Sequence, residues 1–228
     1  NFIHDFEKVE SDHVSYAAFL KGNSRDGLFE RNLVICERDH SGGVRLGLSL
    51  GGGGSSPGSI CEDGTCTPEH QHGMLRNNVI INCPADVGIY LNAAADTRIY
   101  DNTLIATTGI DVRFAASTAD IRNNLVSGQI RNRDGGTSTQ SSNVTGITTI
   151  QYEQWFADPL AADFVNLVLN QLGDDAARVS AGIVFSDNAV ASGAGLLERL
   201  GLAVDCARLA LGAFDKLAYR IAENRLRP

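Results

Sequence analysis

Cationic and aromatic side chains recur on one side of short alternating segments in the first 133 residues. Aliphatic residues such as Leu48, Ile89 and Val112 take every second position, which is typical of strands with one buried face. The residues expected to point outward in one strip are Phe19, Lys21, Arg45, Tyr90, Asn92, Asp111, Arg113 and Arg131. Guanidinium groups pair with carboxylates or sulfates, and aromatic faces can pack against sugar rings. The strip predicts a surface for an acidic polysaccharide; a solvated charged face is the alternative.

A second set of reactive side chains lies in the phrase CTPEHQHG. The candidate metal ligands in it are Glu69, His70 and His72. His-x-His places both imidazoles on the same side of an extended segment, which suits a metal site. The adjacent carboxylates Glu62 and Asp63 are a weaker candidate for calcium. We therefore consider a divalent cation, calcium first; a metal-free polar loop and a catalytic histidine base are the alternatives.

An asparagine precedes an apolar run at regular intervals along the same part of the chain. These residues are Asn32, Asn78, Asn102 and Asn124, at intervals of 46, 24 and 22, and 46 is twice 23. A period of this length indicates a repeat architecture. Each unit holds two short strand-like phrases, as one coil of a parallel β-helix does. The sequence predicts an all-β solenoid, a right-handed parallel β-helix, over residues 1–150.

Stacking of coils explains the repeated asparagines. Residues at one point of successive coils lie about 4.8 Å apart. Asparagine tolerates the left-handed backbone of a bend, and its amide can donate to the equivalent amide one coil away. We expect Asn78, Asn102 and Asn124 on adjacent coils, with Asn143 opening a last partial coil.

Two segments depart from the repeat. Residues 51–73 hold four consecutive glycines, two prolines and two cysteines, which favours a loop insertion that carries function. After residue 150 the alternation ends, and from Gly195 apolar residues recur at helical spacing. The open end of a β-helix exposes apolar side chains and strand edges. Residues 151–228 are therefore expected to form a C-terminal cap, α-helical or mixed; a separate interaction domain is the alternative.

The five cysteines form two candidate pairs and one remainder. Cys61 and Cys66 end a short polar loop that can close on itself. Cys36 and Cys83 follow repeat asparagines by four and five residues, so stacking of those phrases makes them neighbours. The pairs predict disulfides and an oxidising compartment, with Cys206 left over; five reduced cysteines are the alternative.

Composition and local patterns exclude several classes of protein. The 228 residues carry a formal net charge of −8, which argues against a general nucleic-acid binder. No apolar run predicts a transmembrane helix, and no serine-hydrolase or phosphate-loop motif is present. The acidic start NFIHDFEKVE is unlike a signal peptide, while Asn1 already fits the repeated phrase. We expect the chain to begin inside a longer, secreted or periplasmic protein.

The repeated asparagine phrases resemble the right-handed parallel β-helix, pectate-lyase-like superfamily. Within it, FLKGNSRDGLFERNLVI and GGVRLGL resemble the chondroitinase-B and alginate-lyase type of polysaccharide lyase. In that type a lysine precedes an asparagine-rich strand and an arginine follows about one coil later. The resemblance implies that Lys21 is the general base and that Arg45 neutralises a uronate carboxylate. Leu46 and Gly47 follow Arg45 here, where that type has histidine and glycine, and its calcium ligands are not recognisable.

The implied reaction is β-elimination from an acidic, uronate-containing polysaccharide. A base removes the proton at C5, alpha to the carboxylate, and positive charge stabilises the developing enolate. A lysine whose pKa is lowered by neighbouring arginines can be that base. A non-catalytic glycan-binding module, surface or adhesin-like, is the second hypothesis. Glycoside hydrolysis needs two converging carboxylates; Asp111 is the one clear outward carboxylate of the strip, so hydrolysis ranks last.

Overall fold

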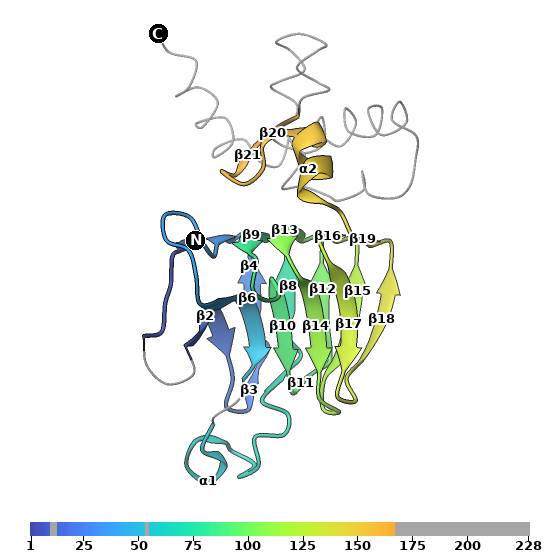
Figure 1. Ribbon diagram of the computed structural model, residues 1–228. Helices are drawn as coiled ribbons and strands as arrows, with labels where there is room; N and C mark the ends of the chain where they lie inside the picture. The colour runs from blue at the N-terminus through green and yellow to red at the C-terminus, as the bar shows by residue number, and fades with distance from the viewer. Residues whose placement is uncertain (10–12, 53–54, 167–228) are drawn as a thin grey trace.

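The computed structural model describes residues 1–9, 13–52 and 55–166. Short parallel strands in this part of the chain form three long sheets and a small corner sheet (Figure 1). Sheet A contains β1 (Phe2–His4), β5 (Leu33–Ile35), β9 (Val79–Cys83), β13 (Thr103–Thr107), β16 (Leu125–Val126) and β19 (Val144–Thr145). Sheet B contains β2 (Val14–Leu20), β6 (Val44–Gly51), β10 (Ile89–Asn92), β14 (Gly109–Arg113) and β17 (Gln129–Arg133).

The remaining two sheets complete each turn of the chain. Sheet C, at the corner, contains β3 (Ser24–Arg25), β7 (His70–Gln71) and β11 (Ala94–Ala95). Sheet D contains β4 (Leu28–Glu30), β8 (Met74–Arg76), β12 (Thr97–Tyr100), β15 (Thr118–Arg122) and β18 (Thr137–Ser141). From β9 the chain visits β10, β11 and β12, and β13 then pairs in parallel with β9. Parallel strands stacked in this order are consistent with the predicted β-solenoid.

The long interval in the asparagine repeat is one coil with a loop inserted in it. β5 pairs directly with β9, with Leu33 opposite Val79, so the two strands belong to adjacent coils. The inserted loop contains the single turn α1 (Pro57–Ile60). It ends earlier than expected, because β7 pairs in register with β3 and β11 and so belongs to the coil.

The predicted asparagine ladder is confirmed. Asn78 Nδ2 donates to Asn102 Oδ1 at 2.9 Å, and Asn102 Nδ2 donates to Asn124 Oδ1 at 3.0 Å. The ladder continues to Asn143 in one direction and through Asn32 to Asn1 in the other. The left-handed residue is the one before each ladder asparagine, for example Asn77 with φ of 54° and Asn123 with φ of 55°. In the phrase RNN the first asparagine therefore makes the bend and the second makes the ladder.

Residues 147–166 fold back over the outer face of sheet A (Figure 1). α2 (Thr149–Trp155) begins at a capping box of Thr148 and Gln151. β20 (Phe156–Asp158) and β21 (Asp163–Asn166) then form an antiparallel pair. Apolar contacts join this segment to sheet A through Tyr152, Phe156, Phe164, Ile35, Ile81 and Ile105. Most of the predicted 151–228 cap lies outside the described residues, so the cap stays a prediction.

The last described coil of the stack carries polar residues at positions that are apolar one coil earlier. The aligned pairs are Val112 with Asn132, Ile121 with Gln140, and Ala119 with Ser138. Ser138 Oγ donates to Asn132 Oδ1 at 2.8 Å, and Gln140 Nε2 donates to Ser138 Oγ at 3.1 Å. This end of the core is therefore closed partly by side chains that water can solvate.

Both predicted disulfides are present. Cys36 and Cys83 join adjacent coils with their Cα atoms 5.0 Å apart, and Cys61 and Cys66 close the inserted loop with Cα atoms 5.2 Å apart. Two disulfides are compatible with an extracellular location. Among the described residues, no helix has the length and apolar character needed to cross a membrane.

Candidate functional site

The outer face of sheet B brings most of the predicted polysaccharide-binding residues together. One row across the strands contains Phe19, Ser49, Tyr90, Asp111 and Arg131. The next row contains Gly51, Asn92, Arg113 and Arg133, and Lys21 follows β2 at the start of that row. We call these two rows, with Lys21, the sheet B surface. The expected alternation is confirmed for β10, β14 and β17 by the residues that pack in the core, which are Ile89, Leu91, Ile110, Val112 and Ile130.

One end of the sheet B surface is aromatic. The Phe19 side chain is 48% exposed, and its ring meets Tyr16 edge to face with centroids 5.7 Å apart. Tyr16 also lies beside Tyr90, at 6.4 Å between ring centroids. Lys21 Nζ lies 5.5 Å from the centre of the Phe19 ring. An exposed ring supported from behind and flanked by a cation can stack on an apolar sugar face and attract an anionic substituent.

The other end of the sheet B surface is rich in arginine. Asp111 is fully buried and its two oxygens accept from Arg131 Nε at 2.6 Å and Arg133 Nη1 at 2.5 Å. The two arginine side chains remain 44% and 43% exposed. The hydrogen bond that Arg133 donates to Asp111 raises the pKa of Arg133. A buried carboxylate thus holds two exposed guanidinium groups in place, and each keeps further N–H groups that can bind an anion.

Arg113 links the two ends. It donates through Nη1 to the Tyr90 hydroxyl at 3.2 Å and through Nε to Asp134 at 2.5 Å. Its guanidinium also lies 4.6 Å from the centre of the Phe114 ring. The hydrogen bond with Asp134 is the largest cause of the raised pKa of Arg113. The surface, with Asp134, therefore carries four cations and two carboxylates, a local positive balance on a chain of net charge −8.

The prediction that Arg45 lies exposed in this strip is wrong. Arg45 is 2% exposed. It lies opposite Ser15 in the register of β2 and β6, six residues before Gly51 along the same strand. Its guanidinium donates to the backbone oxygens of Phe6 at 2.9 Å and Gly42 at 2.6 Å, and Nη1 meets Glu37 at 3.3 Å. Arg45 holds the loop before β6 together and is not available to a polysaccharide on the sheet B surface.

A change of phase within β6 explains this error. Leu46, expected to point inward, packs with Val87 and Tyr90 in a cluster separate from the core that holds Leu48. At Gly47, between these two leucines, a Cβ atom would lie only 2.8 Å from Ile80 Cγ2 of the core. The period-two alternation therefore does not continue through Gly47, and Arg45 takes a buried position.

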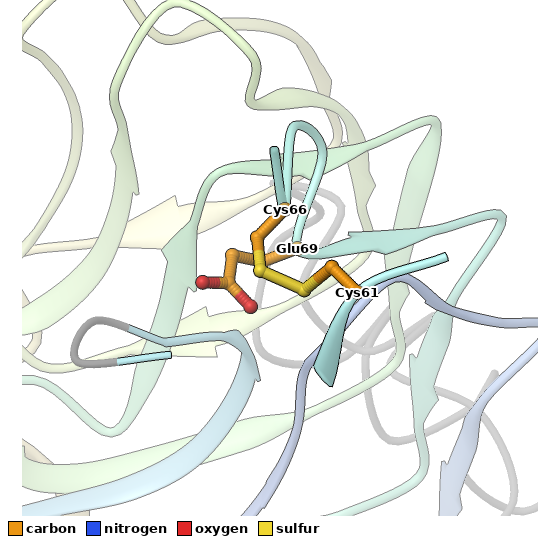
Figure 2. Close-up of side chains that lie close together, drawn as sticks. All are labelled: Cys61, Cys66 and Glu69. Atoms are coloured by element: carbon orange, nitrogen blue, oxygen red, sulfur yellow. A yellow bond between two sulfur atoms is a disulfide. The ribbon is translucent and has the colours of Figure 1, made fainter. Parts of the chain in front are cut away.

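The inserted loop rests against the turn that follows Lys21. Glu69 Oε2 accepts from the Gly22 amide at 2.9 Å and from Ser55 Oγ at 3.0 Å. Asn23 Nδ2 donates to the Pro68 carbonyl at 2.6 Å. Figure 2 shows the Glu69 side chain beside the Cys61–Cys66 disulfide. The loop thus borders the lysine end of the sheet B surface.

The three predicted metal ligands do not come together. His70 is fully buried; its Nδ1 bonds with Ser24 Oγ at 2.8 Å and its Nε2 accepts from the Gly27 amide at 3.3 Å. Burial lowers the pKa of His70. His72 is half-exposed between Asp26 and Asp96, at 3.8 and 3.7 Å. In the described part of the chain, the groups with closely spaced ligand atoms are Cys61–Cys66–Glu69 and His4–Asp5–Asp39.

The carboxylates considered for calcium already have partners in and beside the loop. Asp63 Oδ1 accepts from the Thr65 and Cys66 amides, both at 2.7 Å, and these amide bonds help to hold its pKa well below the usual range. Glu62 is largely exposed and pairs with Arg25 at 3.3 Å. Asp63 therefore organises the loop turn, and calcium binding by this pair stays a prediction.

Sequence reasoning missed Tyr16 and Asp134. The register of β2 and β6 skips the pair Ala17 and Gly47. The period-two alternation breaks there, so it gave no signal that Tyr16 faces outward. Asp134 lies just after β17 with φ of 50°, so strand periodicity carried no signal for it. The arrangement as a whole can stack a sugar ring and hold anionic groups.

Comparison of the chain with protein-family models, with curated proteins and with solved structures found no match.

Proposed function

We propose that this protein binds an acidic polysaccharide along the sheet B surface. The observation that carries the proposal is the pair of exposed arginines, Arg131 and Arg133, fixed on the buried carboxylate of Asp111. Because the clamp orients both guanidinium groups before a ligand arrives, less side-chain entropy is lost on binding. The chain has a net charge of −8, so a cluster of positive charge is better explained by binding of an anion than by a need for solubility.

The dimensions of the surface suit an extended chain. Neighbouring parallel strands lie about 4.8 Å apart, so the four steps from Phe19 to Arg131 cover roughly 19 Å. A polysaccharide laid across the strands would meet the exposed Phe19 ring at one end and the arginines at the other. Stacking then orients the sugar and charge pairing selects acidic polymers.

We also propose the handedness of the β-helix and the location of the protein. Parallel crossover connections are right-handed in nearly all proteins, which favours a right-handed β-helix of the pectate-lyase-like type. The two disulfides support a secreted or periplasmic protein.

Polysaccharide lyase activity is a narrower form of this proposal. Lys21 lies at the start of the row that continues through Asn92 to Arg113, so a base and a cation share one surface. Arg45 is buried elsewhere, so a lyase reaction would need Arg113 or another cation to neutralise the uronate carboxylate. Three strand steps of about 4.8 Å separate Lys21 from Arg113, a long reach for two groups on one sugar. The non-catalytic binding module is therefore the form that the geometry supports better.

Binding is tested with paired arginine variants. Arg131→Ala/Arg133→Ala should weaken binding to uronate or sulfated oligosaccharides by about tenfold or more, and added salt should weaken binding by the wild-type protein. Arg122→Ala is the matched control, because Arg122 also pairs with an aspartate, Asp120 at 2.7 Å, but on sheet D. Equal loss in the control, or no binding of any acidic glycan by the wild-type protein, would refute the proposal.

Catalysis is tested separately with the same glycans. If the protein is a lyase, the ultraviolet absorbance of unsaturated uronates should rise with time. Lys21→Ala should then abolish the product while most of the binding remains, because a base acts mainly in the transition state. Binding by the wild-type protein without any such product would leave the non-catalytic module.

A further inference from the structure

The inserted loop contains a buried carboxylate, and no cation among the described residues forms an ion pair with it. Glu69 is 7% exposed, and its side-chain contacts are the Gly22 amide and the Ser55 hydroxyl, both at Oε2. Within the described residues no lysine, arginine or histidine forms an ion pair with it. A buried carboxylate loses much of its hydration, and two neutral donors replace only part of it. A cation beside Glu69 would offset this cost.

Two sulfur atoms lie next to this carboxylate. Cys61 and Cys66 are 8% and 5% exposed, and their Sγ atoms and a Glu69 oxygen lie within 4.8 Å of one another. Figure 2 shows the three side chains converging from both sides of the loop. In a tetrahedral zinc site with Zn–S bonds of about 2.3 Å, two sulfurs lie roughly 3.8 Å apart. In the disulfide the two sulfurs are bonded to each other, so they have to move apart after reduction to reach this separation, while the Glu69 oxygen already lies beside them.

We propose that, when the Cys61–Cys66 disulfide is reduced, Cys61, Cys66 and Glu69 bind one zinc ion. Two thiolates and one carboxylate form a ligand set that zinc accepts, with water as the fourth ligand. The site is distinct from the sheet B surface and does not depend on polysaccharide binding. Zinc would place a cation beside Glu69, and it would close the same loop that the disulfide closes.

The redox chemistry is that of a thiol pair and an external reductant. A dithiol exchanges with the disulfide and becomes a disulfide itself, while Cys61 and Cys66 each gain a hydrogen and together gain two electrons. Zinc then displaces the two thiol protons to solvent as both Zn–S bonds form. Oxidation of the two thiolates reverses the sequence and releases zinc.

The segment that carries the ligands is ordered by contacts that do not involve the sulfurs. Asp63 accepts from the amides of Thr65 and Cys66. Asn23 holds the loop from outside, through the Pro68 carbonyl and through the Asp63 amide at 3.2 Å. These bonds can persist after reduction, so the ligands do not have to be gathered from a disordered loop, which lowers the entropic cost of binding.

The experiment uses the full chain with Cys206→Ser as background. A water-soluble phosphine reduces the protein without oxygen: water supplies the oxygen of the phosphine oxide and the two thiol hydrogens. Thiol counting should show two new thiols, because Cys36 and Cys83 are fully buried. The reduced protein should then retain one zinc per chain, and cobalt in its place should give a thiolate charge-transfer band. The oxidised protein should retain none.

Three variants make the result decisive. Glu69→Gln should weaken zinc binding by about tenfold or more, since even the loss of an outer-shell partner costs as much. Cys61→Ser/Cys66→Ser should abolish it. Glu62→Gln is the matched control, because Glu62 belongs to the same loop but its side chain is 80% exposed, and it should bind as the wild type does. No zinc on protein with two counted thiols, full affinity in Glu69→Gln, or zinc on the double variant would each overturn the proposal.

Discussion

Arg45 and Glu37 form an ion pair, Nη1 to Oε1 at 3.3 Å, with side chains only 3% and 12% exposed. The pair joins the loop between sheets A and B to the start of β6, where Arg45 also donates to the carbonyls of Phe6 and Gly42. One guanidinium therefore ties the chain before β2 to the loop before β6. Arg45, one of the two residues that the family resemblance implies for catalysis, therefore has a structural role in this fold.

Arg45→Ala should destabilise the protein strongly. It leaves the largely buried Glu37 without its cationic partner and removes the donors to the Phe6 and Gly42 carbonyls, a loss of about 3–5 kcal/mol in the free energy of unfolding. Arg45→Lys should recover only part of it, because an ammonium lacks the planar fork that reaches several acceptors. Urea unfolding measures both. A folded Arg45→Ala protein of normal stability that had lost glycan binding would contradict the structural role.

Asn102→Ala should break the asparagine ladder at its centre. Asn102 Oδ1 accepts from the backbone and side-chain nitrogens of Asn78, and its Nδ2 donates to the Leu75 carbonyl. Each buried group left unpaired costs about 1–3 kcal/mol, so we expect a loss of about 3 kcal/mol or more. Asn143→Ala, at the half-buried end of the ladder, should cost less because water can replace the lost bonds. Thermal or urea unfolding of both variants gives the comparison, and equal losses would contradict it.

The sequence predicted the ladder and the disulfides because both depend on a period. Once Asn32 and Asn78 are known to stack, the pairing of their coils follows, and Cys36 must lie beside Cys83. Arg45 could not be placed in this way, since one irregularity at Gly47 reverses the side chains before it. Asp111 was predicted to face outward and does, but its complete burial comes from the arginines above it. Strand alternation predicts the face of the sheet toward which a side chain points. It does not predict whether neighbouring side chains bury it.

The two disulfides should contribute unequally to stability. In the loop-entropy model the stabilisation grows with the length of chain enclosed, giving about 4 kcal/mol for the 47-residue separation of Cys36–Cys83 and about 2 kcal/mol for the five-residue separation of Cys61–Cys66. Paired serine variants and urea unfolding measure these differences. Denatured, unreduced wild-type protein should show one free thiol, that of Cys206. Five free thiols would remove the argument for an oxidising compartment.

Acidification should destabilise the fold through His70. Gly27 N–H donates to Nε2, so that nitrogen is unprotonated and protonation breaks the bond. Burial holds the pKa of His70 below its ordinary value of 6.5, so the unfolded chain binds the proton more readily than the folded one. The stability from neutral His70 is therefore complete above about pH 6.5 and falls as the pH drops below it. Unfolding free energies measured from pH 7.5 to 5 should show this slope in the wild type and a flatter one in His70→Gln; parallel slopes would contradict the assignment.

Asp134→Asn should tighten binding of an acidic polysaccharide. Asp134 lies within 2.5 Å of Arg113 Nε, and both side chains are partly exposed, at 49% and 34%, so its negative charge opposes an anion approaching that guanidinium. Asparagine keeps an acceptor for Arg113 and tolerates the left-handed φ of 50° at this position, so the fold should not change. Removing one exposed charge is worth about 0.5–1 kcal/mol, or roughly a two- to fivefold gain in affinity at low salt, and the gain should fade at high salt. Asp111→Asn should do the opposite despite the same change of charge, because Asp111 is buried and fixes Arg131 and Arg133. Titration of both variants with one uronate oligosaccharide measures the two effects side by side. Changes of the same sign would mean that net charge alone, and not the clamp on Asp111, governs binding at this surface.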